Sequence, residues 1–116
     1  MLIAYKGNSD VFSQNSAFES KARASQVAKI MYLELRNTFD LPERDEELLE
    51  SLIYLLIHNV NSELNVFLTI AQITDLLEDA TRYRVSNLLK LLEKANVLFI
   101  RKGVVTVCYL DRSVRS

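Results

Sequence analysis

The sequence predicts a mainly α-helical protein that carries one small β-hairpin. Only two Gly and one Pro occur among its 116 residues, so few helix-breaking residues interrupt the chain. Apolar residues make up 49% and charged residues 25%, the balance of a globular protein. Two runs of β-branched and aromatic residues, 97–101 and 104–109, flank Lys102-Gly103, and a two-residue turn with Gly is typical of a hairpin. The length allows one compact domain of ordinary size.

Residues 1–42 are predicted to be an N-terminal extension that ends in a helix over 17–37. The apolar residues within 2–5 allow a short edge strand before it. Ser16 is expected to cap the helix, because Glu19 three residues later would complete a capping box. The helix ends before Pro42, since the residue before a proline avoids the helical region.

A second helix is predicted over 45–60, at the start of a unit that covers 43–116. Its first residues are rich in Glu and Asp, which could indicate an acid/base or metal site. The stronger interpretation is that acids favour the first turn of a helix, where the helix dipole is positive. His58, near the other end, is expected to face solvent or to interact with the dipole, and not to act as a ligand.

Both of these helices are apolar around most of their circumference. A compact domain of this size covers one such helix more easily than two. We therefore predict a homodimer through the helices 17–37 and 45–60, with four small residues available for close helix approach: Ala22, Ala24, Ser25 and Ala28. The alternative is that both helices are fully covered within one chain.

The second half of the chain predicts two short helices joined by a tight turn. A three-residue strand is possible over 66–68, and Thr69 is a suitable N-cap for a helix over 70–77. Thr81 is the corresponding cap for a helix over 82–95, whose apolar residues follow the i, i+3, i+4, i+7 pattern of one helical face: Val85, Leu88, Leu89 and Leu92. Asn96 can adopt the left-handed conformation that ends a helix. The order predicts a helix-turn-helix at about 70–95, a wing at about 97–110 and an added N-terminal helix.

The stretch ITDLLEDATRYRVSNLLKLLEKANVLFIRKGVVTVCYLD (73–111) resembles the winged helix-turn-helix of bacterial regulators. It is similar to the DNA-binding domains of the cyclic-AMP-receptor type and of the multiple-antibiotic-resistance type. The positions that carry the resemblance are Leu76-Leu77, Thr81, Val85, Leu88, Leu92 and Val97-Leu98. The chain departs from the pattern at Glu78-Asp79-Ala80 and at Asn96, where the family commonly has Gly. The resemblance implies binding of double-stranded DNA.

Charge is segregated along the chain. Residues 79–116 contain eight bases and three acids, a net charge of +5, whereas residues 1–78 contain six bases and twelve acids, a net charge of −6. The overall value of −1 therefore hides a basic C-terminal third on an acidic body. A localised basic surface is the electrostatic signature of a nucleic-acid binder.

The predicted DNA-contacting residues lie on the side of the helix 82–95 opposite its apolar face, and at the wing tip. They are Thr81, Arg82, Tyr83, Arg84, Ser86, Asn87, Lys90, Lys94, Arg101 and Lys102. Arg82 and Arg84 suit guanine edges and Asn87 suits adenine in the major groove. The lysines suit phosphates, and the wing tip suits the backbone or the adjacent minor groove.

Several functional classes are not expected. One Cys (Cys108) and one His cannot form an internal disulfide or a His/Cys zinc site. No apolar run reaches the length of a membrane span, and no secretory signal or glycine-rich phosphate loop is recognisable. We therefore expect a cytoplasmic protein that is not an enzyme, with no cofactor, metal or small-molecule site.

Two functions remain open from the sequence. The first is sequence-specific binding of double-stranded DNA by a small dimeric transcriptional regulator, or by a replication or maintenance factor of a plasmid or phage. The alternative is a winged-helix adaptor that docks a protein partner through Tyr83, Leu91 and the wing, without binding DNA.

Overall fold

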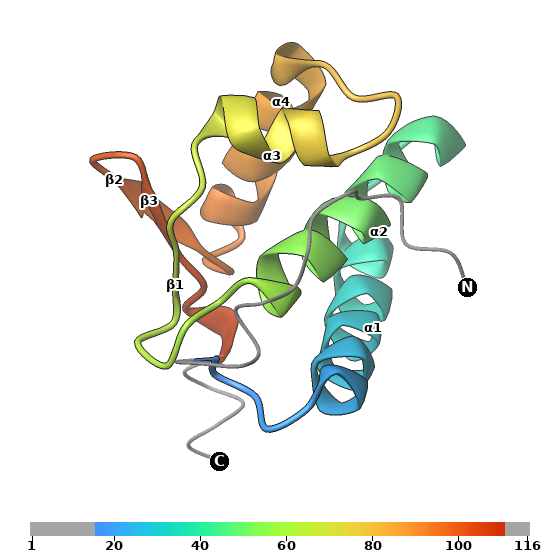
Figure 1. The fold of residues 1–116 in the computed structure, drawn as a ribbon. Coiled ribbons are helices and arrows are strands. Elements are labelled where there is room, and N and C mark those ends of the chain that lie inside the picture. Colours follow the sequence, from blue (N-terminus) through green and yellow to red (C-terminus); the bar gives the residue numbers. More distant parts are fainter. Residues whose placement is uncertain (1–15, 111–116) are drawn as a thin grey trace.

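The computed structural model describes residues 16–110, which form four helices and a three-stranded antiparallel sheet (Figure 1). The elements are α1 (Lys21–Thr38), α2 (Glu43–His58), β1 (Asn65–Val66), α3 (Ile70–Leu76), α4 (Arg82–Lys94), β2 (Phe99–Arg101) and β3 (Val104–Thr106). The prediction of a mainly helical chain with a small β-hairpin is confirmed. The strand considered for 2–5 falls outside the described residues.

Helix α1 begins four residues later than predicted. Its N-cap is Ser20, whose hydroxyl accepts a hydrogen bond from the Arg23 N–H at 3.1 Å. Ser16, the predicted cap, instead forms an isolated β-bridge with Asn61 and accepts the N–H of Phe18. The backbone of this segment is therefore paired with the loop after α2, which prevents it from joining the helix.

Helix α2 is the centre of the core, as predicted, and it lies between α1 on one side and α3 and α4 on the other (Figure 1). It starts and ends two residues before the predicted bounds of 45–60. Three acids, Glu43, Asp45 and Glu46, occupy its first turn, where the helix dipole favours negative charge. From Leu52 onward every residue of the helix is buried within this one chain.

His58 is buried, so the expectation that it faces solvent is wrong. Its Nδ1 lies 2.8 Å from the Tyr54 carbonyl oxygen and donates to it, while Nε2 lies 3.0 Å from the Ser25 hydroxyl on α1. The ring also stacks on Tyr54. Burial lowers the pKa of His58 below its ordinary value of 6.5, nearby Lys21 acts in the same direction, and the hydrogen bond to Tyr54 opposes both. The periodicity of an all-round apolar helix could not reveal this, because the partner hydroxyl comes from α1.

The helices α3 and α4 begin where their caps predict. Thr69 and Gln72 form a reciprocal capping box, and Thr81 accepts the N–H of Arg84 at 3.2 Å. The predicted apolar face of α4 is buried: Val85, Leu88, Leu89 and Leu92. Each helix ends one residue before its predicted bound, α3 at Leu76 and α4 at Lys94.

The sheet has the order β1-β3-β2, so the first strand pairs with the last. Lys102 and Gly103 both have positive φ (52° and 80°), as a two-residue hairpin turn of type I′ requires. Both hairpin strands are shorter than predicted. Val97 and Leu98 pack into the core before β2 begins, and β3 ends at Thr106 because the chain turns there, with the Cys108 N–H donating to the Thr106 carbonyl oxygen at 3.2 Å. The strand considered for 66–68 forms as β1 over Asn65–Val66.

Candidate nucleic-acid interface

The outer face of α4 carries six of the predicted contact residues. Thr81, Arg82, Tyr83, Asn87, Lys90 and Lys94 are exposed, whereas Ser86 is half-buried. Tyr83 is 76% exposed. Within residues 16–110, no hydrogen bond or ion pair engages the side chains of Arg82, Lys90 or Lys94. These cations are therefore available to an external anion.

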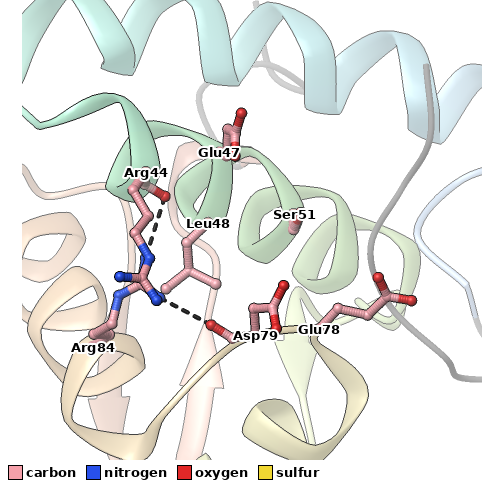
Figure 2. A pocket seen from close by; sticks show the side chains of 7 residues that line it. All are labelled: Arg44, Glu47, Leu48, Ser51, Glu78, Asp79 and Arg84. Atoms are coloured by element: carbon pink, nitrogen blue, oxygen red, sulfur yellow. Dashed lines mark hydrogen bonds between the residues drawn. The ribbon is translucent and has the colours of Figure 1, made fainter.

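Arg84 is oriented differently, because its half-buried guanidinium is hydrogen-bonded to other parts of the protein. Nε and Nη2 donate to one carboxylate oxygen of Asp45 at 3.2 and 3.0 Å, which forms a salt bridge to α2. Nη1 donates to the Asp79 carbonyl at 2.9 Å and Nη2 to the Arg44 carbonyl at 3.2 Å, the two bonds drawn in Figure 2. One side chain thus joins the start of α2, the α3–α4 turn and the first turn of α4.

The turn itself depends on Asp79, which has a φ of 54°. This left-handed conformation is one that Gly adopts readily and Asp tolerates. It falls in the segment where the resembling family has Gly, and Asn96 is likewise left-handed with a φ of 61°. The departures from the family pattern at 78–80 and 96 are therefore compatible with the same backbone conformation.

Beside the Arg84 contacts lies a cavity of about 210 Å³, shown in Figure 2. Its lining residues are Arg44, Glu47, Leu48, Ser51, Glu78, Asp79 and Arg84. Although three carboxylates border it, no group of three His, Cys, Asp or Glu residues within 16–110 is arranged to hold a metal ion. The two arginines on the same cavity balance most of the negative charge.

The tip of the hairpin places two more predicted residues in solvent. Arg101 and Lys102 are both exposed, and the Arg101 guanidinium carbon lies 5.8 Å from the centroid of the Phe99 ring. Glu93, one of two acids between 79 and 110, accepts the N–H of Ile100 at 3.2 Å. That bond holds the Glu93 carboxylate at the open edge of β2.

The outer side of α1 is the other notable surface. A shallow groove of about 620 Å³ runs along it, lined by Ala22, Ser25, Gln26, Lys29, Ile30, Leu33 and Tyr54. Ile30 and Leu33 are 48% and 42% exposed. Because most of α2 is covered within the chain, α1 offers nearly all of this groove, and Tyr54 is the α2 residue that lines it.

Cys108 is half-buried, with its Sγ 3.3 Å from the Asn96 carbonyl oxygen, and it lies just after β3 and not within a strand. Over 16–110, the helices all fall short of the length and apolar content needed to cross a bilayer. No family model, curated protein or solved structure was found to match this chain.

Proposed function

We propose that this chain binds double-stranded DNA through a winged helix-turn-helix formed by residues 43–116, with α4 as the recognition helix in the major groove. The observation that carries the proposal is the division of α4 into two faces. One face is buried in the core, and the other presents Arg82, Asn87, Lys90 and Lys94 to solvent. A major groove admits a helix of this kind with its N-terminal part against base edges.

The arrangement of the elements supports the same proposal. A helix, a short strand, two helices and a β-hairpin follow one another, and the short strand joins the hairpin in one sheet. The hairpin then stands beside α4 as a wing, with Arg101 and Lys102 at its tip. These two cations would contact phosphates or the neighbouring minor groove.

Within this proposal the two arginines of the first turn of α4 have separate roles. Arg82 is exposed and would read a guanine edge, next to Asn87 for an adenine. Arg84 is bonded to Asp45 and to two backbone carbonyls, so it would position α4 without touching DNA. Lys90 and Lys94, further along the helix, would contact phosphates.

We propose that the protein acts in the cytoplasm as a dimer that occupies a palindromic site on DNA. Self-association would use the α1 groove, where Ile30 and Leu33 remain exposed. Two recognition helices related by a two-fold axis would lie about 34 Å apart, one turn of DNA. Such a protein would be a transcriptional regulator, or a replication or maintenance factor of a plasmid or phage.

Fluorescence anisotropy with duplex DNA fragments tests the proposal at several salt concentrations. The variant Arg82→Ala/Lys90→Ala removes two cations from α4, and Arg23→Ala/Arg36→Ala removes two exposed cations from α1, outside the α1 groove, as a matched control. We expect the α4 variant to bind at least tenfold more weakly, with a shallower salt dependence, because counterion release scales with phosphate contacts. The control should stay within about twofold.

Two results would contradict duplex binding through α4. One is equal loss of affinity in both variants, which would indicate non-specific attraction to any cation. The other is the absence of binding at low salt, in which case recovery of one stoichiometric protein partner through Tyr83 and the wing would favour the adaptor.

A further inference from the structure

The sheet has an outer face whose aromatic side chains the duplex-binding proposal does not use. The register places Asn65, Thr106 and Phe99 opposite one another in a row across the three strands. The Thr106 hydroxyl donates to the Asn65 side-chain oxygen at 2.6 Å, so this row lies on one face of the sheet. In the next row Val66 and Val105 are buried and Ile100 is half-buried, which identifies the other face as the core side.

Two phenylalanine side chains stand in solvent on or beside the outer face. Phe99 belongs to the row just described and is 41% exposed. Phe67 follows β1 directly, two residues after Asn65, and is 66% exposed. Because side chains alternate along an extended chain, we infer that Phe67, two residues after Asn65, lies on the same side. Phe67 and Phe99 are the two exposed phenylalanines between residues 16 and 110.

Cations accompany the rings. Arg101 lies two residues after Phe99 on the same side of β2, with its guanidinium 5.8 Å from the Phe99 ring centroid, and Lys102 follows at the turn. The strand residues of this face are Asn65, Phe99, Arg101, Val104 and Thr106. None of them is acidic, and the charges of Arg101 and Lys102 outweigh that of the Glu93 carboxylate, which accepts the N–H of Ile100 at the β2 edge. A positive sheet surface with exposed aromatic rings suits a polyanion that carries planar groups.

We propose that this surface, made of Phe67, Phe99, Arg101 and Lys102, binds the unpaired bases of a single-stranded nucleic acid. The rings would stack on bases and the two cations would contact the adjoining phosphates. Paired bases cannot take part, because stacking inside a duplex hides their faces. The surface shares Arg101 and Lys102 with the proposed wing, but its two rings take no part in the proposed duplex binding, so substitutions of Phe67 and Phe99 test it independently of that proposal. Together the two sites would hold a melted strand beside a duplex site, as a replication factor requires.

The chain contains no tryptophan, which makes stacking directly measurable. Phe99→Trp introduces a single indole whose emission reports contact with a base. We expect titration with a 15-nucleotide oligothymidine to quench this emission until the surface is saturated. Phe67→Leu and Phe99→Leu keep an apolar side chain but remove the ring, and each should weaken oligothymidine binding by at least fivefold.

Two control measurements distinguish stacking on these rings from general attraction to apolar or charged surface. Arg36→Ala removes an exposed cation from α1, across the molecule from the sheet and outside the α1 groove, and should leave oligothymidine affinity within about twofold (Figure 1). Binding of duplex DNA to the two Leu variants should also stay within about twofold of the original chain. If duplex binding fails altogether while oligothymidine binding persists, the α4 proposal falls and this one stands.

The proposal is overturned if the chain does not bind oligothymidine at low salt, or if the emission of the Trp variant is unchanged at saturation. Leu variants that bind oligothymidine as tightly as the original chain would also overturn it. Equal weakening of duplex and single-strand binding would do the same. So would light scattering that shows a dimer split by Phe67→Asp or Phe99→Asp, because the face would then belong to a second copy.

Discussion

The junction between α2 and α4 and the outer face of α4 use the same residue types for opposite purposes. At the junction, Arg84 makes four hydrogen bonds to Asp45, Arg44 and Asp79, so its charge is satisfied inside the protein. On the outer face, Arg82 is exposed, and no hydrogen bond or ion pair within residues 16–110 engages its side chain. The difference shows that a basic side chain on a helix becomes available for binding only where no carboxylate or carbonyl lies within its reach.

Geometry explains the contrast. Residues two positions apart in an α-helix are rotated by about 200° about the helix axis, so Arg82 and Arg84 point in nearly opposite directions. Arg84 faces the first turn of α2, where acids gather because the helix dipole favours them. The comparison therefore predicts that substitutions on the outer face of α4 weaken DNA binding and change stability little. Substitutions at the junction with α2 should lower stability and affect DNA binding less.

The largest effect is expected on the outer face. Arg82→Ala/Asn87→Ala removes both proposed base contacts and should weaken binding to a specific duplex by about 2 kcal/mol or more. Stability should change by less than ~0.5 kcal/mol, because both side chains are exposed. Duplex titration and urea denaturation of the same variant measure the two quantities. A large loss of stability in this variant would show that the outer face of α4 also stabilises the fold, which would contradict its contrast with the α2–α4 junction.

The junction should show the opposite pattern. Arg84→Ala removes the salt bridge and two bonds to carbonyls, and we expect the free energy of unfolding to fall by ~1–2 kcal/mol. The partial exposure of Asp45 keeps the value modest. Arg84→Lys should retain only part of the stability that Arg84→Ala loses, because an ammonium group cannot reproduce the planar geometry of the guanidinium donors. Urea denaturation measures the free energy of unfolding of all three chains. Equal stability of Arg84→Ala and the original chain would show that the Arg84 hydrogen bonds do not stabilise the fold.

The link between α4 and the hairpin gives a smaller effect. Asn96 has a φ of 61°, so Asn96→Ala should destabilise the chain by ~1 kcal/mol, whereas Asn96→Gly should be neutral or slightly stabilising. Thermal unfolding of the pair measures the difference. Identical melting temperatures for the Ala and Gly variants would contradict the left-handed conformation at this position.

The smallest effect concerns His58, whose pKa is lowered chiefly by burial. The unfolded chain therefore binds this proton more readily than the folded chain does. The contribution of neutral His58 to the free energy of unfolding is fully present above about pH 6.5 and is lost as the pH falls below that value. His58→Gln should flatten this part of the pH profile when melting temperatures are compared between pH 7.5 and 5.5. Parallel profiles for the two chains would show that His58 is not the group responsible.

Local signals predicted much of the fold. Thr69 and Thr81 identified the starts of α3 and α4, and the spacing of Val85, Leu88 and Leu92 identified the buried face of α4. Those signals are contained within a few residues, which is why the sequence alone reveals them. Lys102-Gly103 predicted the hairpin turn for the same reason.

Contacts between distant residues were not predictable in this way. The Arg84–Asp45 salt bridge joins positions 39 residues apart, and Ser25 reaches His58 from another helix. The late start of α1 depends on the pairing of Ser16 with Asn61, again across the chain. The acid-rich first turn of α2 was the one signal that could have directed attention to a basic partner for Asp45.

Selection of bound sequences from random double-stranded DNA tests the central claim most directly. The outer face of α4 should select one recurrent motif, and Arg82→Ala/Asn87→Ala should lose that selectivity while the chain remains folded. If the chain forms the proposed dimer, the motif should be palindromic, with half-sites about one helical turn apart. A folded original chain that enriches no sequence, or a variant that enriches the same motif equally well, would contradict the account.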